Sequence, residues 1–251
     1  MHGTGSDGAS ASKWRGLYRT GGVACLVMVA AILIGAITYM ASPPPTGDAA
    51  EWFALFDRSG LLGMMDMDLV MLVGYLALIP VVAALYALLH RRSESVMALA
   101  AVSAVVAIAT HFASSRVFEM LALSRQYAVA ATEAQRTALL AAGQSMLTTY
   151  LGSFGGPAVL GGWNFQGTAF NVSYVLWSVV GVAISVVILH GDEFGRAVGW
   201  IGIVSFAAAL GLFLPMVGVA LSLVSVVLQL AWFALVARGL FRAARLSEVA
   251  S

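Results

Sequence analysis

The stretch from Asp68 to Leu89, DLVMLVGYLALIPVVAALYALL, decides the fold of this chain. After its first residue it contains no charged side chain. A helix needs about 20 mostly apolar residues to cross the roughly 30 Å hydrocarbon core of a bilayer, and this stretch supplies them. Because lipid cannot hydrogen-bond to backbone groups, the stretch is expected to be a membrane-spanning α-helix.

Five further stretches of the same kind flank it, so we predict six membrane spans. They are expected at residues 21–41, 68–89, 96–123, 168–189, 197–214 and 216–237. The composition agrees, because 61% of the residues are hydrophobic, 10% are charged and the mean hydropathy is +0.92. The predicted fold is all-α, a polytopic bundle of six transmembrane helices. It forms one domain over residues 13–245, between a disordered tail at 1–12 and a C-terminal tail at 246–251.

Two segments between the spans have the pattern of amphipathic helices. In the loop after the first span, Trp52, Leu55 and Phe56 recur at helical spacing. Later, Thr132 and Gln135 fit a capping box, which favours a helix over residues 132–151. One stripe of that helix is apolar or small: Leu139, Leu140, Gly143, Met146, Leu147, Tyr150 and Leu151. We therefore expect one or two amphipathic interfacial helices on the outer face of the bundle.

The distribution of basic residues indicates the orientation in the membrane. With both termini inside, nine basic residues are cytoplasmic: Lys13, Arg15, Arg19, Arg91, Arg92, Arg196, Arg238, Arg242 and Arg245. Four lie outside: Arg58, Arg116, Arg125 and Arg136. The positive-inside rule then favours cytoplasmic N and C termini. The single lysine among 13 basic residues, with abundant Ala, Gly and Val, suggests a GC-rich bacterial genome and hence the bacterial inner membrane.

Composition also excludes several classes of function. The net charge of +1 argues against nucleic-acid binding, which needs a concentrated basic surface. Cys25 is the only cysteine, so an intramolecular disulfide or a thiolate cluster is impossible. No cofactor is predicted. The expected partner is the lipid bilayer, and a homo-oligomer or a membrane-complex partner stays open.

The candidate functional residues begin with a polar series in the third span. His111, Ser115 and Glu119 are spaced i, i+4 and i+8, within one arc of a continuous helix, and Arg116 is placed to pair with Glu119. Ionisable residues inside a membrane are costly, so each is a functional candidate. The series fits a proton relay, or a metal or substrate site opening outward. The alternative, which we favour, is one buried, hydrogen-bonded histidine beside an interfacial ion pair.

The start of the second span, Met64-Met65-Asp66-Met67-Asp68 with Met71 one turn later, supplies further candidates. Thioethers and carboxylates could bind a metal ion, with Met64, Asp66, Met67, Asp68 and Met71 as ligands. The alternative, which we favour, is that the Asp residues cap a helix and the Met residues fill apolar interfaces.

These segments should meet at the outer level of the membrane. If the protein has a site, we expect His111 and Glu119 to face the bundle interior with Asp66 or Asp68 within reach. Asn164, Gln166 and Asn171 could join this cluster from the next span.

The chain resembles the bacterial multi-pass membrane proteins grouped as domain of unknown function 4386. The resemblance is carried by Arg15-Gly16-Leu17-Tyr18-Arg19, by Ala130-Ala131-Thr132-Glu133-Ala134-Gln135-Arg136 with Leu139-Leu140-Ala141-Ala142, and by Ala237-Arg238-Gly239-Leu240-Phe241-Arg242. It covers nearly the whole chain, and it implies no activity and no catalytic residue.

Three functions remain open at this point. The leading hypothesis is a binding, accessory or small-solute-handling module without catalysis, because no catalytic nucleophile, zinc-ligand spacing or phosphate loop is recognisable. The second is a membrane-embedded hydrolase or redox enzyme that uses the His111, Glu119, Asp66 and Asp68 cluster. The third is a small-solute transporter, which would need polar residues along both halves of the membrane.

Overall fold

The computed structural model describes residues 5–45, 48–151 and 167–249, and these residues contain helices and no strand. The helices are α1 (Gly5–Ala41), α2 (Ala49–Arg58), α3 (Gly60–Met67), α4 (Leu69–Leu89), α5 (Glu94–Ser114), α6 (Val117–Ala128), α7 (Glu133–Leu151), α8 (Thr168–Leu189), α9 (Arg196–Leu210), η2 (Gly211–Phe213) and α10 (Gly218–Val249). The predicted all-α fold is confirmed. Helix α1 begins inside the segment 1–12 that was expected to be disordered.

Six helical stretches among the described residues are long and apolar enough to cross a membrane. They are Trp14–Ala41, Leu69–Leu89, Glu94–Ala128, Thr168–Leu189, Arg196–Phe213 and Gly218–Glu248. The protein therefore has the helices of a multi-pass membrane protein, as predicted. Many exposed side chains on these helices are apolar, including Leu99, Val102 and Val105 on α5, which suits a surface that faces lipid.

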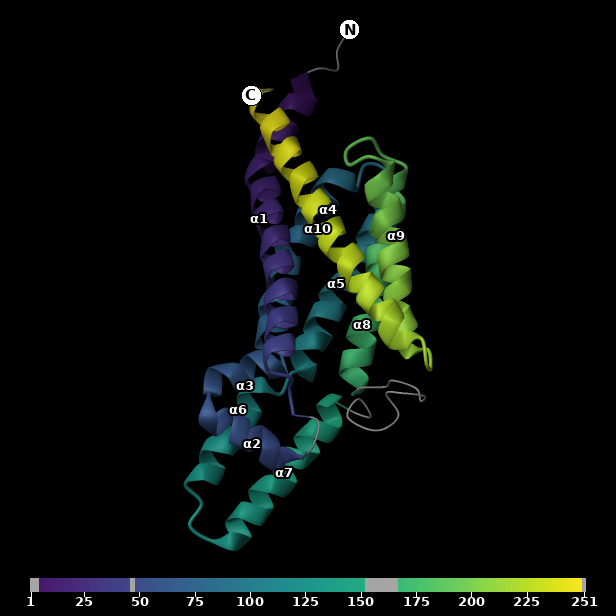
Figure 1. Cartoon of the computed structure of the whole chain (residues 1–251). Coiled ribbons are helices and arrows are strands. Elements are labelled where there is room, and N and C mark those ends of the chain that lie inside the picture. The colour runs from purple at the N-terminus through teal and green to yellow at the C-terminus, as the bar shows by residue number, and fades with distance from the viewer. Residues whose placement is uncertain (1–4, 46–47, 152–166, 250–251) are drawn as a thin grey trace.

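The spanning helices form a closed ring in which each one packs against two neighbours (Figure 1). Helix α4 lies against α1 and α5, α5 against α8, α8 against α9, and α9 against α10, which returns to pack on α1. The direction of the chain alternates from one spanning helix to the next. The start of α1 and the end of α10 therefore lie at the same end of the bundle. There Arg15 forms an ion pair with Glu248 at 2.7 Å.

Small residues allow the close approach of these helices. A Cβ on Gly199 of α9 would lie 2.9 Å from the Ser185 carbonyl oxygen of α8, which shows that the two backbones are nearly in contact. A hydrogen bond also joins α9 to α10: the Ser205 hydroxyl donates to the Ser225 carbonyl at 3.1 Å.

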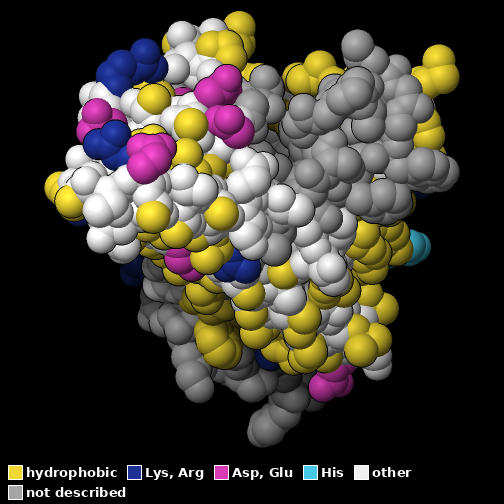
Figure 2. Space-filling view, turned by 90° about the horizontal axis from the view of Figure 1, so that it is seen from below, with side chains coloured by type: hydrophobic (Ala, Val, Ile, Leu, Met, Phe, Trp, Pro, Cys, Tyr) yellow, Lys and Arg dark blue, Asp and Glu magenta, His cyan; other side chains and the backbone are white. Residues whose placement is uncertain are grey.

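A second layer, formed by α2, α3, α6 and α7, covers the end of the bundle opposite the termini (Figure 1). It has its own apolar cluster, whose buried aromatic members are Trp52, Phe53 and Phe56. Figure 2 views the molecule from this end and shows charged side chains gathered on one part of the surface beside hydrophobic ones.

The two amphipathic helices predicted from the sequence are both present in this layer. In α2, Trp52, Leu55 and Phe56 are buried. The predicted capping box precedes α7, because the Gln135 amide donates to the Thr132 hydroxyl at 3.2 Å and the Thr132 amide donates to the Gln135 side chain at 3.3 Å. The apolar stripe of α7 turns inward at Gly143 and Leu147, which are buried.

The third predicted span, 96–123, is not one continuous helix. Helix α5 ends at Ser114, Ser115 has extended backbone angles (φ −63°, ψ 141°), and α6 begins at Val117. The new direction lets α6 bury its own apolar face on α2, where the Ser124 hydroxyl donates to the Phe53 carbonyl at 3.1 Å. The expectation of a single helix from His111 to Glu119 is therefore wrong.

Candidate functional site

The candidate site lies where the bundle meets the second layer, at the end of α5 and the beginnings of α4 and α8. Asp68 separates α3 from α4, and its φ of −173° and ψ of −4° interrupt the helix. His111 lies in the last turn of α5, just before the break at Ser115. Two interruptions of the helices, at Asp68 and at Ser115, therefore place these side chains face to face.

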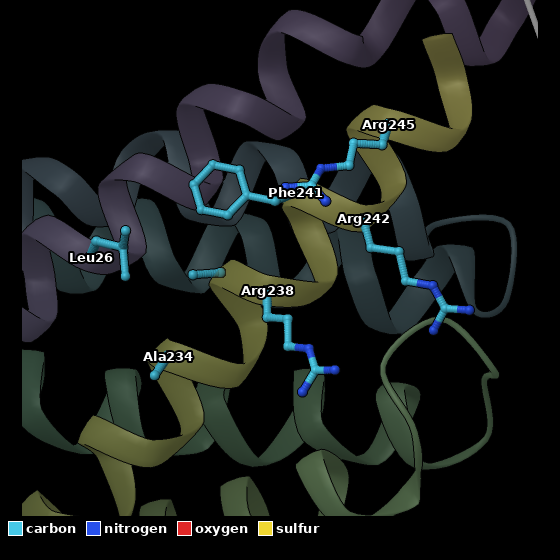
Figure 3. Close-up of a pocket in the computed structure, with 7 residues that line it drawn as sticks. Leu26, Ala234, Arg238, Phe241, Arg242 and Arg245 are labelled. Carbon is cyan, nitrogen blue, oxygen red and sulfur yellow. The ribbon is translucent and has the colours of Figure 1, made fainter. Parts of the chain in front are cut away.

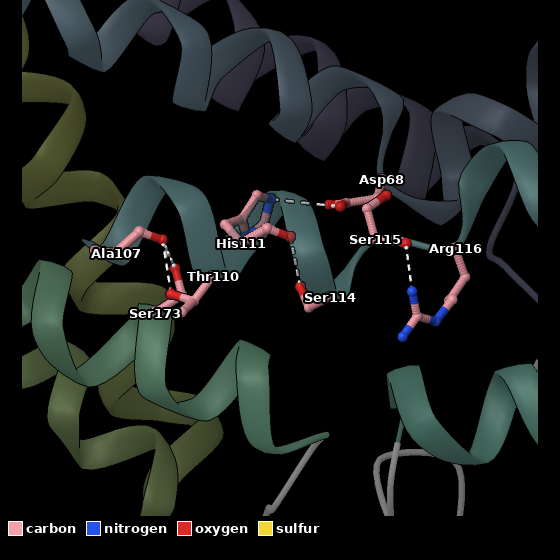
Figure 4. A network of polar contacts seen from close by, with 8 residues as sticks. All are labelled: Asp68, Ala107, Thr110, His111, Ser114, Ser115, Arg116 and Ser173. Carbon is pink, nitrogen blue, oxygen red and sulfur yellow. Dashed lines mark hydrogen bonds and ion pairs between the residues drawn. The ribbon is translucent and has the colours of Figure 1, made fainter. Parts of the chain in front are cut away.

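The centre of the site is a buried contact between an imidazole and a carboxylate (Figure 4). His111 Nε2 lies 3.4 Å from Asp68 Oδ2, and the two side chains are only 3% and 5% exposed. Among the described residues, no other histidine, acidic or basic residue is buried over its whole side chain. The expectation that an aspartate lies within reach of His111 is thus met by Asp68, whose carboxylate makes no helix-capping hydrogen bond.

Aromatic rings fix the orientation of the imidazole. The ring of Tyr75 stacks on His111 with centroids 3.6 Å apart and planes 4° apart. Phe170 of α8 approaches from another side at 6.3 Å. Helix α8 is tied to α5 at the same level, because the Ser173 hydroxyl donates to the Ala107 carbonyl at 2.7 Å. The imidazole is therefore held from both α4 and α8.

Several buried polar atoms of this cluster have no hydrogen-bond partner in the described structure. They are Oδ2 of Asp68, both ring nitrogens of His111, and the Ser115 hydroxyl. At 3.4 Å the His111–Asp68 contact is longer than a well-formed hydrogen bond. Buried polar groups in proteins are nearly always hydrogen-bonded, so this cluster keeps a capacity to bind that no protein group uses.

Asp66 lies just before the site, in α3. Both of its carboxylate oxygens are buried without a hydrogen-bond partner. Burial raises the pKa of Asp66 above its ordinary value, because the charged form loses its hydration. Asp66 thus adds a second carboxyl group with unused hydrogen-bonding capacity two residues before Asp68.

Arg116 and Glu119 do not join the His111–Asp68 pair. Arg116 Nη1 donates to the backbone carbonyls of Ala113 at 3.2 Å and Ser115 at 3.3 Å. Glu119 lies on α6, 3.8 Å from Arg116, and its side chain is 48% exposed. The expectation that Glu119 faces the bundle interior is wrong, because the break at Ser115 turns it away.

The remaining candidates contribute less. Asn171 is half-buried on the first turn of α8, and Asn164 and Gln166 lie outside the described residues. Met67 is buried in the second apolar cluster, Met64 packs against that cluster, and Met71 lies close to Gly35 of α1. These methionines occupy apolar interfaces, as the structural alternative predicted.

Among the described residues, no three His, Cys, Asp or Glu side chains lie close enough together to hold a metal ion. The site is better suited to hydrogen bonding. It offers a carboxylate that accepts, an imidazole that donates and accepts, and a hydroxyl that does both.

Sequence reasoning missed Tyr75, Phe170 and Ser173, which form the walls of the site. All three lie inside long apolar stretches, where an aromatic or small polar residue is ordinary packing material. Only the placement of Tyr75 one helical turn beyond Met71, on a predicted span that begins with an acidic residue, hinted at its position.

The chain was compared with models of protein families, with curated proteins and with solved structures, and none of them matches it.

Proposed function

We propose that this chain is a multi-pass protein of the bacterial inner membrane that binds a small polar solute at the His111–Asp68 pair and catalyses no reaction. The observation that carries the proposal is the burial of this pair together with its unused hydrogen-bonding capacity. Burying polar groups without hydrogen-bond partners costs free energy. A ligand that forms hydrogen bonds with these groups would therefore gain binding free energy.

The distribution of polar groups favours binding at one end over transport through the bundle. The buried ionisable pair lies at the end covered by the second layer. Elsewhere, most buried hydroxyls bond to helix carbonyls, as Ser178 does to Tyr174 and Ser205 to Ser225. The buried Ser185 hydroxyl is the exception, with no hydrogen-bond partner among the described residues. A hydroxyl bonded to a helix carbonyl stabilises helix packing and has little left to offer a passing solute.

The same pair supports one alternative, an enzyme in which His111 acts as a general base. Asp68 contacts Nε2, and Nδ1 has no partner in the described structure, which resembles a base oriented by a carboxylate. The membrane family resemblance is compatible with either function. Turnover that is lost in His111→Ala would favour the enzyme, whereas saturable binding without turnover favours the binding protein.

We further propose that both termini are cytoplasmic, which places the His111–Asp68 pair near the periplasmic surface. The support is the excess of basic residues at the end that holds the termini, including Arg19, Arg196 and Arg242.

Cysteine labelling tests whether polar molecules reach the site. In a Cys25→Ala background, a membrane-impermeant thiol reagent applied to intact cells should label Ser115→Cys. It should label Ser145→Cys, an exposed position on α7, faster, and Ser185→Cys, fully buried between α8 and α9, hardly at all. A solute that binds should slow the labelling at position 115. If position 115 reacts no faster than position 185, the proposal fails.

A further inference from the structure

Three arginines near the end of α10 lie on one helical face, and none of them has a partner among the described residues. Arg238, Arg242 and Arg245 are spaced i, i+4 and i+7, and all three are exposed. No hydrogen bond or ion pair joins them to another described residue, whereas Arg15 pairs with Glu248 and Arg92 pairs with Glu193 at 3.1 Å. Three neighbouring guanidinium charges repel each other unless an anion is bound between them.

These arginines border a groove between α1 and α10 (Figure 3). The groove has a volume of about 460 Å³ and is lined by Leu26, Ala234, Ala237, Arg238, Phe241, Arg242 and Arg245. Its shape depends on Gly22 of α1, because the Phe241 ring occupies the space that a Cβ there would need. The groove is thus apolar toward Leu26 and Ala234 and strongly basic toward Arg245.

The change from apolar to basic follows the direction of the membrane normal. Leu26 and Ala234 lie within the predicted spans, and Arg242 and Arg245 lie beyond the apolar run of α10. Arg238 comes directly after that run, so its guanidinium is near the level of lipid phosphates. This is the arrangement in which an acyl chain covers the apolar part and a headgroup lies against the arginines.

We propose that this groove binds an anionic phospholipid of the cytoplasmic leaflet, with its phosphodiester between Arg238 and Arg242 and one acyl chain along Leu26 and Ala234. Guanidinium groups bind phosphate oxygens two at a time, which favours a phosphate over a hydrated small ion. The proposal rests on the membrane assignment and is independent of any ligand at His111.

Lipid titration of the purified full-length chain tests the proposal. Phosphatidylglycerol should bind at least tenfold more tightly than phosphatidylcholine of the same acyl chains, measured by native mass spectrometry, and should raise the melting temperature more. Arg238→Gln/Arg242→Gln should lose about tenfold or more of the affinity for phosphatidylglycerol. Arg58→Gln/Arg136→Gln removes the same charge at the other end of the molecule and should keep the preference. Equal phosphatidylglycerol affinity in both double variants would overturn the proposal.

A second variant separates a lipid site from a simple anion site. Ala234→Trp fills the apolar part of the groove and keeps all three arginines, so it should weaken phosphatidylglycerol binding too. Soluble glycerophosphoglycerol, the headgroup without acyl chains, should raise the melting temperature little at the same concentration. If glycerophosphoglycerol stabilises the protein as well as phosphatidylglycerol does, or if an acidic peptide competes fully while Ala234→Trp has no effect, the groove is not a lipid site.

Discussion

The rings of Tyr75 and His111 stack almost in parallel, with centroids 3.6 Å apart and planes 4° apart. This contact joins the beginning of α4 to the end of α5 and points Nε2 of the imidazole at Asp68. The aromatic ring, rather than a hydrogen bond, holds the histidine in place, since neither ring nitrogen has a hydrogen-bond partner in the described structure.

The first prediction concerns this stack. Tyr75→Ala should lower the free energy of unfolding by about 3–5 kcal/mol, because it empties a buried aromatic position and releases the imidazole. Tyr75→Phe keeps the ring and should cost less than about 1.5 kcal/mol. Reversible unfolding in mixed detergent micelles measures both, and an equal loss in the two variants would mean that the hydroxyl, not the stack, is important.

The second prediction is an energetic coupling between His111 and Asp68. Asp68→Ala and His111→Ala should each destabilise the protein by about 3 kcal/mol or more, because each leaves a buried polar partner behind. The double variant should lose less than the sum of the two, by about 0.5–3 kcal/mol. Strict additivity in this double-mutant cycle would show that the 3.4 Å contact contributes nothing to stability.

The third prediction uses the pH dependence of stability at Asp66. Burial raises the pKa of Asp66, so the folded chain holds the proton more tightly than the unfolded chain. The free energy of unfolding therefore falls as the pH rises from the ordinary Asp value through the raised one. Asp66→Asn removes this loss and should stabilise the protein at neutral pH, with a gain that shrinks on acidification. Asp57→Asn, at an exposed position on α2, serves as the control, and a gain independent of pH would contradict the argument.

The fourth prediction compares two glycines. A Cβ on Gly202 would clash with the Ser185 hydroxyl oxygen and with Trp232 Nε1, whereas a Cβ on Gly16 would have nothing within 4 Å. Gly202→Ala should therefore cost about 1–3 kcal/mol through overpacking. Gly16→Ala, in the exposed part of α1, should stabilise by about 0.5–1 kcal/mol. A melting-temperature series would reveal the opposite signs, and a neutral Gly202→Ala would show that α8, α9 and α10 are loosely packed.

The fifth prediction concerns topology. A cytoplasm-active reporter fused after residue 251 should be active, and an export-dependent reporter inserted at residue 47 should be active as well. The reason is the nine-to-four bias of basic residues toward the terminal end. An export-dependent reporter that works at residue 251 would reverse the orientation and place His111 toward the cytoplasm.

The sequence predicted the spans well because lipid imposes a simple rule: about 20 apolar residues per helix. It also predicted the contact of His111 with an aspartate, since costly buried charges tend to pair. The failure at Glu119 has a physical cause. The Ser114-Ser115-Arg116 break contains neither proline nor glycine, and it forms because α6 gains apolar packing on α2. Such tertiary packing has no local signature in a sequence.

The return of α10 to α1 has a consequence for how the protein is made. The face of α1 that carries Gly22 packs on Phe241 of α10, which the ribosome adds almost a whole chain length later. Until α10 enters the bilayer, this face of the first helix can contact only lipid or an assembly factor. The last helix therefore completes the bundle, and early termination of translation leaves an unfinished protein whose exposed glycine face is open to quality-control proteases.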